Sequence, residues 1–170
     1  MFGILSLALA LSFVLFNAAI AACPSSSTAR FVLKKGEAFD TRTRLTWKRC
    51  SVGTIWKDRG GCIGERSFME LKAALKAAQD AGSGGRVPTV SELQSLIDEK
   101  CGVPPIDVAA FPDLRVQKGE GDIDGDESPY WTVSEFGAAN LVYYVDFSTG
   151  NVDAHSPGFA LAVRLVRSSP

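Results

Sequence analysis

The chain has 170 residues, a formal net charge of −1, and nearly equal numbers of basic and acidic side chains, 18 and 19. This length suits a single domain. A charge so close to zero gives no electrostatic case for binding nucleic acid or an anionic membrane.

The first 22 residues carry no charged side chain and are almost wholly apolar, and they end in small residues. This pattern predicts a cleaved export signal over residues 1–22 and one mature domain over residues 23–170. Because the segment lacks the usual basic start, an uncleaved membrane anchor stays open as an alternative. A further alternative is a lipoprotein, since residues 20–23 resemble a lipobox with Cys23 as the lipidated residue.

The sequence therefore predicts a secreted or periplasmic protein, or alternatively a lipoprotein anchored through Cys23. Only in the second case is a membrane expected as a partner. Four cysteines in an oxidising compartment predict two disulfides, and three pairings are open. Cys50 and Cys62 bracket a short glycine-rich loop, which favours joining them and leaves Cys23 for Cys101.

The N-terminal part of the mature chain predicts two strands, over residues 30–34 and 45–49. In the second strand Leu45 and Trp47 share one apolar face. Residues 51–64 contain several glycines between the two cysteines and predict a loop.

Two helices are expected next, because the pattern of a capping box occurs twice. In such a box a hydroxyl and a carboxylate three residues later satisfy backbone N–H groups of the first turn. The boxes are Ser67 with Glu70 and Thr89 with Glu92. The apolar positions at helical spacing are Phe68, Leu71, Leu75 and Ala78 in the first helix, and Leu93, Leu96, Ile97 and Cys101 in the second.

The last third of the chain predicts antiparallel strands over residues 130–133, 141–147 and 161–165, with a turn at 148–151 after which the chain reverses. The order of strands, two helices and strands predicts an α+β fold with antiparallel sheets, and not a wound parallel sheet.

Five sequence blocks occur in a characteristic order. They are residues 40–50 (DTRTRLTWKRC), 85–93 (GRVPTVSEL), 130–132 (YWT), 144–147 (YVDF) with Gly150, and 163–167 (VRLVR). In these blocks the chain resembles the Lcl C-terminal domain family, a large bacterial family long treated as a domain of unknown function. The resemblance covers nearly all of the mature chain. It departs from the family pattern at Gly85 and Tyr143, where tryptophan is usual, and at Arg44, where glycine is usual.

The resemblance implies a C-type-lectin-like fold related to that of formylglycine-generating enzymes, with the N- and C-terminal strands close together. Some relatives are linked to adhesion and glycosaminoglycan binding. We therefore expect an exported, disulfide-stabilised binding module without catalytic activity, whose partner is a carbohydrate or a protein at the cell surface. The alternatives are a structural envelope protein without a small ligand, and an enzyme of the formylglycine-generating type.

No catalytic residue is expected. His155 is the only histidine, and its neighbours Asp153 and Ser156 do not form an evident catalytic arrangement with it. No cofactor or metal site is expected either, although Asp122, Asp124 and Asp126 form a weak calcium candidate. The spacing of this acidic run does not fit an EF-hand loop.

The expected ligand surface involves aromatic side chains of the C-terminal strands. Tyr144 lies on the opposite face from the apolar positions of its strand, and Trp131 lies on a neighbouring strand. We therefore predict that Trp131, Tyr144, Asn151 and His155 border one shallow ligand surface. A sheet covered on both faces would bury the aromatic side chains instead. Arg86 is expected to form a structural ion pair or to bind backbone carbonyls.

Overall fold

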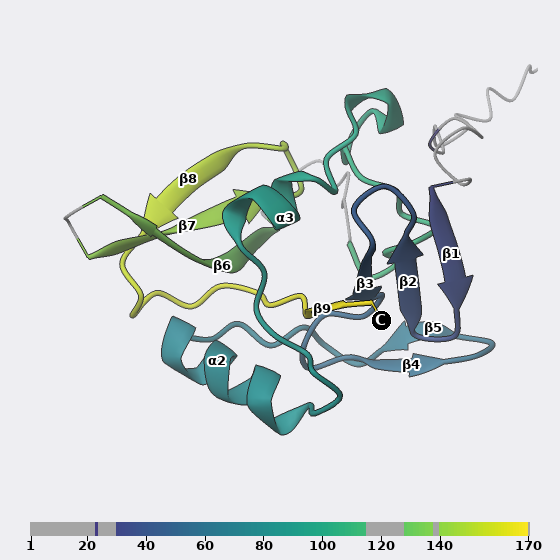
Figure 1. The fold of residues 1–170 in the computed structure, drawn as a ribbon, viewed down its shortest axis with the longest axis horizontal. Coiled ribbons are helices and arrows are strands. Elements are labelled where there is room, and N and C mark those ends of the chain that lie inside the picture. The colour runs from purple at the N-terminus through teal and green to yellow at the C-terminus, as the bar shows by residue number, and fades with distance from the viewer. Residues whose placement is uncertain (1–22, 24–29, 115–127, 138–139, 170) are drawn as a thin grey trace, which may run out of the picture.

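The computed structural model describes residue 23 and residues 30–114, 128–137 and 140–169. In this part of the chain, antiparallel sheets and two α-helices form an α+β fold (Figure 1), which confirms the predicted class. The closer likeness to C-type lectins, which the resemblance implies, stays a prediction. Among the described residues, no helix has the length and apolar character needed to span a membrane.

The first sheet joins the two ends of the domain. It contains β1 (Phe31–Lys34), β2 (Glu37–Asp40), β3 (Leu45–Lys48) and β9 (Val166–Ser168), in the order β1-β2-β3-β9. The last strand pairs antiparallel with β3, so that Trp47 lies opposite Val166. The N- and C-terminal strands therefore belong to one sheet, as expected.

The second sheet is covered on both faces. It contains β6 (Pro129–Phe136), β7 (Leu141–Asp146) and β8 (Val152–His155). On one face, Tyr130 and Val145 pack in a core with Leu93 of α3 (Val90–Gln94). On the other face, Trp131 and Val142 pack in a core with the small residues of α2 (Leu71–Asp80).

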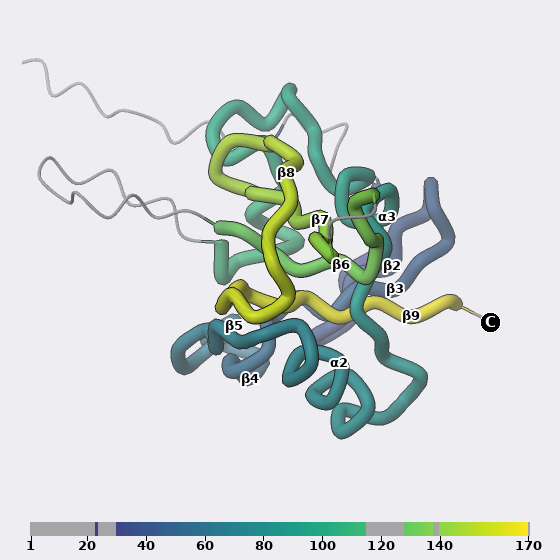
Figure 2. The backbone as a smooth tube through the Cα atoms, turned by 90° about the vertical axis from the view of Figure 1, so that its left-hand side faces the viewer, coloured from purple at the N-terminus to yellow at the C-terminus, as the bar shows by residue number. Residues whose placement is uncertain are grey.

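The C-terminal segment completes the second core. It runs between α2 and the sheet of β6, β7 and β8, as Figures 1 and 2 both show. Leu161, Val163 and Leu165 are buried there. The predicted strand over residues 161–165 is wrong in its bounds, because this stretch forms only isolated bridges, Met69 with Leu161 and Tyr130 with Ala162, and the strand proper is β9.

The predicted loop at residues 51–64 contains a hairpin. Strands β4 (Ile55–Lys57) and β5 (Gly61–Ile63) pair antiparallel, with Trp56 opposite Cys62. The Cys62 sulfur is bonded to Cys50, so the disulfide ties the hairpin to the end of β3. The glycines that suggested a loop supply its turns, since Gly61 and Gly64 adopt positive φ.

The two capping boxes have different outcomes. Thr89 and Glu92 form the predicted box, with both reciprocal hydrogen bonds present. The box predicted at Ser67 is wrong, because α2 begins at Leu71 and its N-cap, Glu70, makes no side-chain cap. Residue Met69 instead exchanges backbone hydrogen bonds with Leu161, which holds the preceding stretch extended.

The buried face of α2 agrees only in part with the prediction, since Ala78 is buried and Leu71 packs against the second core, as expected. Its fully covered residues are Ala74 and Ala78, whereas Phe68 and Leu75 are 50% and 41% exposed. Small side chains let the helix approach the C-terminal segment closely. The apolar positions predicted for the second helix are covered, since Leu93 and Leu96 are buried and Ile97 is partly buried. The predicted extent of that helix is wrong, because α3 ends at Gln94 and both Leu96 and Ile97 follow it. The short 3₁₀ helix η1 (Glu99–Cys101) follows and buries Cys101.

Candidate functional site

The predicted aromatic surface is only partly formed. The pairing of β6, β7 and β8 places Trp131 beside Tyr144 and Val142 beside His155, so these side chains share one face of the sheet. However, α2 and the C-terminal segment cover this face. Trp131 has no exposed surface, and its Nε1 donates a hydrogen bond of 2.8 Å to the Met69 carbonyl oxygen. The expectation that Trp131 borders a ligand surface is therefore wrong.

The other three predicted ligand residues do not gather around one point. Tyr144 is half-buried and packs against the second core. Asn151 precedes β8 and His155 ends it, which separates their Cα atoms by about 13 Å along an extended strand. The His155 ring stacks on Phe159, with 3.8 Å between the ring centroids, and its Nδ1 accepts a hydrogen bond from the Ser156 backbone.

The described residues contain no group of three or more histidine, cysteine, aspartate or glutamate side chains that could hold a metal ion. The calcium candidate of Asp122, Asp124 and Asp126 lies outside the described residues.

Both predicted disulfides are confirmed. Cys50 is bonded to Cys62, and Cys23 is bonded to Cys101. Disulfides of this kind indicate an oxidising, extracytoplasmic setting. A Cys23 sulfur held in this bond is not available for the thioether to a lipid, so the second disulfide is incompatible with the lipoprotein alternative.

A buried polar network, which the sequence did not reveal, lies at the centre of the domain. The Arg164 side chain has no exposed surface and donates a hydrogen bond of 2.6 Å to Asp113 Oδ1. It also donates to the backbone carbonyls of Lys48 and Arg49, at 2.9 and 2.7 Å. The guanidinium carbon lies 4.9 Å from the centre of the Phe111 ring.

Electrostatics keep this network charged. Burial alone would raise the pKa of the Asp113 carboxyl. The charge and hydrogen bond of Arg164 and the hydrogen bonds from Ser51 together outweigh burial, so the pKa lies below its usual value. The Ser51 backbone N–H donates to the same carboxylate, and the Ser51 hydroxyl hydrogen-bonds Tyr130 at 2.6 Å. Because the ion pair is covered, we assign it a structural role.

Two further ion pairs, each between an arginine and a carboxylate, join different segments of the chain. Arg30 forms a two-pronged ion pair with Asp40. Burial raises the pKa of Asp40, but Arg30 and neighbouring hydrogen-bond donors, chiefly the Arg42 backbone N–H, together outweigh it, so the pKa lies below its usual value. Arg86 forms a second such pair with Glu92, with N–O distances of 2.6 and 2.7 Å. This confirms the expected structural ion pair of Arg86.

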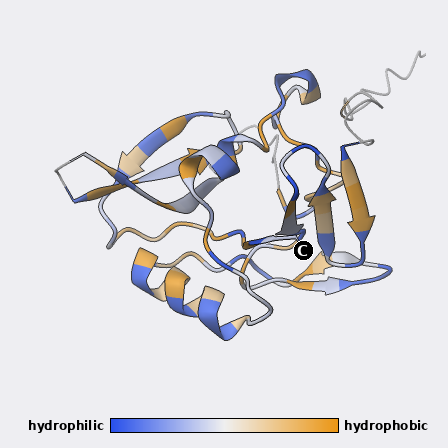
Figure 3. Cartoon of the chain, in the orientation of Figure 1, coloured by the Kyte–Doolittle hydropathy of each residue, from blue (hydrophilic) through white to orange (hydrophobic). Residues whose placement is uncertain are grey.

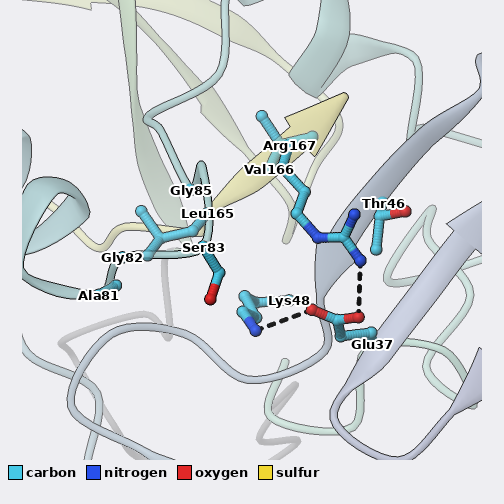
Figure 4. A pocket seen from close by; sticks show the side chains of 10 residues that line it. All are labelled: Glu37, Thr46, Lys48, Ala81, Gly82, Ser83, Gly85, Leu165, Val166 and Arg167. Carbon is cyan, nitrogen blue, oxygen red and sulfur yellow. Dashed lines mark hydrogen bonds and ion pairs between the residues drawn. The ribbon is translucent and has the colours of Figure 1, made fainter. Parts of the chain in front are cut away.

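One small surface hollow lies between β3, β9 and the turn after α2. Figure 4 shows Glu37 at its edge, joined to Lys48 and Arg167, each at 2.9 Å. Hydrogen bonding to Arg167 is the largest cause of a lowered pKa of Glu37. The interior volume is about 10 Å³, which is room for about one water molecule and not for an organic ligand.

A larger open groove of about 650 Å³ lies beside the turn between β7 and β8. Three separate parts of the chain form it: the turn after β2, the stretch from α3 to η1, and the turn before Asn151. We call it the α3–η1 groove. Its lining residues are Arg42, Gln94, Ile97, Asp98, Glu99, Lys100 and Gly150.

Hydrogen bonds hold two of the groove side chains, Arg42 and Asp98, in place. One guanidinium nitrogen of Arg42 donates to the Ser95 carbonyl oxygen at 2.6 Å. Arg30 donates to the same oxygen at 2.7 Å, which links the groove to the Arg30–Asp40 pair. The Asp98 side chain caps η1 by accepting from the Lys100 backbone at 3.1 Å.

The Gly150 position lets the β7–β8 turn approach the groove closely. It has a φ of +83°, and a Cβ there would lie 3.1 Å from Pro105 Cγ and 3.5 Å from Ile97 Cγ2. The turn therefore requires glycine on two grounds, its backbone conformation and its packing.

The groove offers several kinds of polar contact at once. Arg42 and Lys100 are cationic, Asp98 and Glu99 are anionic, and Gln94 carries an amide. This mixture suits a ligand with both an acidic group and many hydroxyl groups. Of the four predicted ligand residues, only Asn151 is next to a groove residue. The groove residues themselves were not predicted, because charged residues scattered over a helix and a turn form no recognisable sequence pattern.

Comparison with curated proteins finds no match for this chain. Comparison with protein families does find one: the family model described as the Lcl C-terminal domain matches residues 36–167. That range includes β2 to β9, both helices and every residue of the α3–η1 groove. The chain belongs to the Lcl C-terminal domain family.

Proposed function

We propose that this protein is an extracytoplasmic binding module that holds an acidic oligosaccharide, one containing uronic acid, in the α3–η1 groove. The observation that carries the proposal is the groove itself, an open concavity of about 650 Å³ with charged residues from separate loops. This volume falls within the usual range for small-ligand sites. Binding without chemical turnover is part of the proposal.

The chemistry of the groove supports a sugar acid. The planar guanidinium of Arg42 is suited to a carboxylate, and Lys100 adds a second positive charge. Asp98, Glu99 and Gln94 supply acceptors for sugar hydroxyl groups. Ile97 gives an apolar contact for the C–H face of a sugar ring.

The scaffold supports a preorganised site. The disulfide at Cys101 adjoins Lys100, the bond from Arg42 to the Ser95 carbonyl fixes the opposite wall, and Gly150 packs against Ile97. Because these parts of the groove are already held, less conformational freedom is lost on binding than in a fully mobile site. The links of some family members to adhesion and glycosaminoglycan binding agree with this ligand class.

The test is calorimetric titration of the mature chain with a hyaluronan hexasaccharide, an unsulfated uronic-acid sugar. We expect binding that weakens at least tenfold in Arg42→Ala and in Lys100→Ala. Lys72→Ala, an exposed change on α2, should bind like the wild type. Chitohexaose, which is neutral, should bind more weakly than hyaluronan.

Melting curves of each variant show whether the fold is intact, which matters because Arg42 also bonds Ser95. Hyaluronan binding that is absent, or that is equal in the folded Arg42→Ala and wild-type proteins, would contradict the proposal. The mass of the recovered sugar tests whether binding occurs without chemical turnover, since a shortened product would show that the protein cleaves the sugar.

A further inference from the structure

The balanced overall charge conceals a basic end of the molecule. Four exposed basic residues, Lys34, Lys35, Lys57 and Arg59, come from two hairpin turns, one between β1 and β2 and the other between β4 and β5. Carboxylates in the β4–β5 segment are Asp58, which accepts a hydrogen bond from Trp56, and Glu65.

The two turns are packed together as one unit. A Cβ at Gly36 would lie 3.0 Å from the Trp56 Cβ, so the first turn touches the second hairpin. The Arg49 guanidinium lies 3.9 Å from the centre of the Trp56 ring and donates to the Lys35 carbonyl oxygen at 2.9 Å. Figure 1 shows the β1–β2 turn beside β4 and β5.

Exposed aliphatic side chains lie next to these basic residues. On β1, Val32 and Leu33 are 57% and 44% exposed and precede the two lysines. Figure 3 shows this hydrophobic strand ending in a hydrophilic turn. On the second hairpin, Ile55 and Ile63 are 64% and 52% exposed.

The isoleucines form a cross-strand pair. Their Cα atoms are partners in the β4–β5 ladder, so both side chains project from one face of the hairpin. Lys57, two residues beyond Ile55, projects from the same face. We call the exposed residues of both hairpins the hairpin end: Val32, Leu33, Lys34, Lys35, Ile55, Lys57, Arg59 and Ile63.

We propose that the hairpin end docks on the surface of an anionic lipid bilayer. The side chains of Ile55 and Ile63, which share one face, enter the boundary between headgroups and acyl chains. The basic side chains contact lipid phosphates. Interfacial binding gains from buried apolar area and from attraction to anionic lipids together. The long lysine side chains can reach the headgroups while the isoleucines lie deeper.

Charge and apolar surface together favour a lipid surface over a soluble polyanion. A polyanionic polymer would be held by the basic residues alone, and exposed isoleucines would add nothing to its binding. The proposal is independent of the sugar site, since Lys35 precedes β2 whereas Arg42 follows it. The hairpin end and the α3–η1 groove therefore lie at opposite ends of β2, so docking through the hairpin end leaves the groove uncovered.

The test is co-sedimentation of the mature chain with vesicles of equal parts phosphatidylglycerol and phosphatidylcholine. We expect binding that is at least tenfold weaker to pure phosphatidylcholine vesicles and that falls as salt is added. Lys34→Gln with Lys35→Gln should weaken binding at least fivefold. Ile55→Thr with Ile63→Thr, which keeps β-branched side chains in the strands, should do the same.

Matched changes elsewhere serve as controls. Lys72→Gln with Lys76→Gln removes two charges from α2, and Leu75→Thr removes an exposed aliphatic residue there. These proteins should bind vesicles like the wild type, and all variants should bind hyaluronan equally. The proposal is overturned if the protein does not bind phosphatidylglycerol vesicles. It is also overturned if the variant with Ile55→Thr and Ile63→Thr binds these vesicles as tightly as the wild type does.

Discussion

The Arg164 guanidinium lies 2.6 Å from the Asp113 carboxylate, and the two side chains are 0% and 5% exposed. Because removing one partner leaves an uncompensated buried charge, we predict that Arg164→Met lowers the free energy of unfolding by about 3–5 kcal/mol. Urea denaturation measures this loss. The control is Lys72→Met on the exposed face of α2, which should change stability by less than about 0.5 kcal/mol.

The double variant separates charge from packing. When Asp113→Leu accompanies Arg164→Met, no charge stays buried, so the double variant should be more stable than Arg164→Met alone. A double variant that is less stable than either single one would contradict the view that unpaired charge dominates the cost.

Acid should destabilise the fold through its paired carboxylates. The pKa of Asp113, Asp40 and Glu92 lies below the usual value, because an arginine binds the ionised form of each. Their stabilising contribution is complete above the unfolded pKa, near 4, and is lost as pH falls through the lower folded pKa. Unfolding free energy measured by urea titration should therefore fall below about pH 4. Asp113→Asn should make that fall shallower, and an unchanged slope would refute the assignment.

Two segments of the chain that share the capping-box pattern, one beginning at Ser67 and one at Thr89, should respond differently to mutation. Thr89→Ala removes a side chain that accepts from the Glu92 backbone and should cost about 1 kcal/mol. Ser67→Ala should cost less than about 0.5 kcal/mol, because α2 begins four residues later and lacks a side-chain cap. Thermal melts compare the two, and equal losses would contradict the position of the α2 start.

The two disulfides should differ in their contribution to stability. Cys23–Cys101 closes a separation of 78 residues and Cys50–Cys62 one of 12. The chain-entropy relation gives about 4.5 and about 3 kcal/mol for these loops. Replacing the first pair by serine should therefore lower the melting temperature more than replacing the second. Non-reducing peptide mapping of the wild type checks the pairing itself, and a peptide joining Cys62 to Cys101 would refute it.

Local signals in the sequence were enough where tertiary contacts agree with them. The Thr89 box, the buried Leu93 and the Cys50–Cys62 disulfide were predictable, because a cap, an apolar stripe and a short glycine-rich loop are local features. The Cys23–Cys101 disulfide followed only as the pair that was left. The Ser67 box has the same local signal and fails, since the pairing of Met69 with Leu161 holds that segment extended. Nothing near Met69 in the sequence indicates that partner.

The burial of Trp131 depends on packing against distant segments, which the alternation of side chains along a strand does not predict. Alternation placed Trp131 and Tyr144 on one face correctly, but whether α2 covers that face depends on packing between distant segments. The same holds for Arg164 and Asp113, which are 51 residues apart. The groove was missed for this reason as well, because Arg42 and Gly150 meet only in the folded chain.

Binding of an acidic sugar in the α3–η1 groove can be followed residue by residue in an NMR titration. Backbone amide shifts of ¹⁵N-labelled residues 23–170 are followed while a hyaluronan hexasaccharide is added. We expect saturable shifts that are largest at Gln94, Lys100 and Gly150 and are absent in Arg42→Ala. Shifts confined to the β4–β5 hairpin, or no shifts at millimolar sugar, would contradict this expectation.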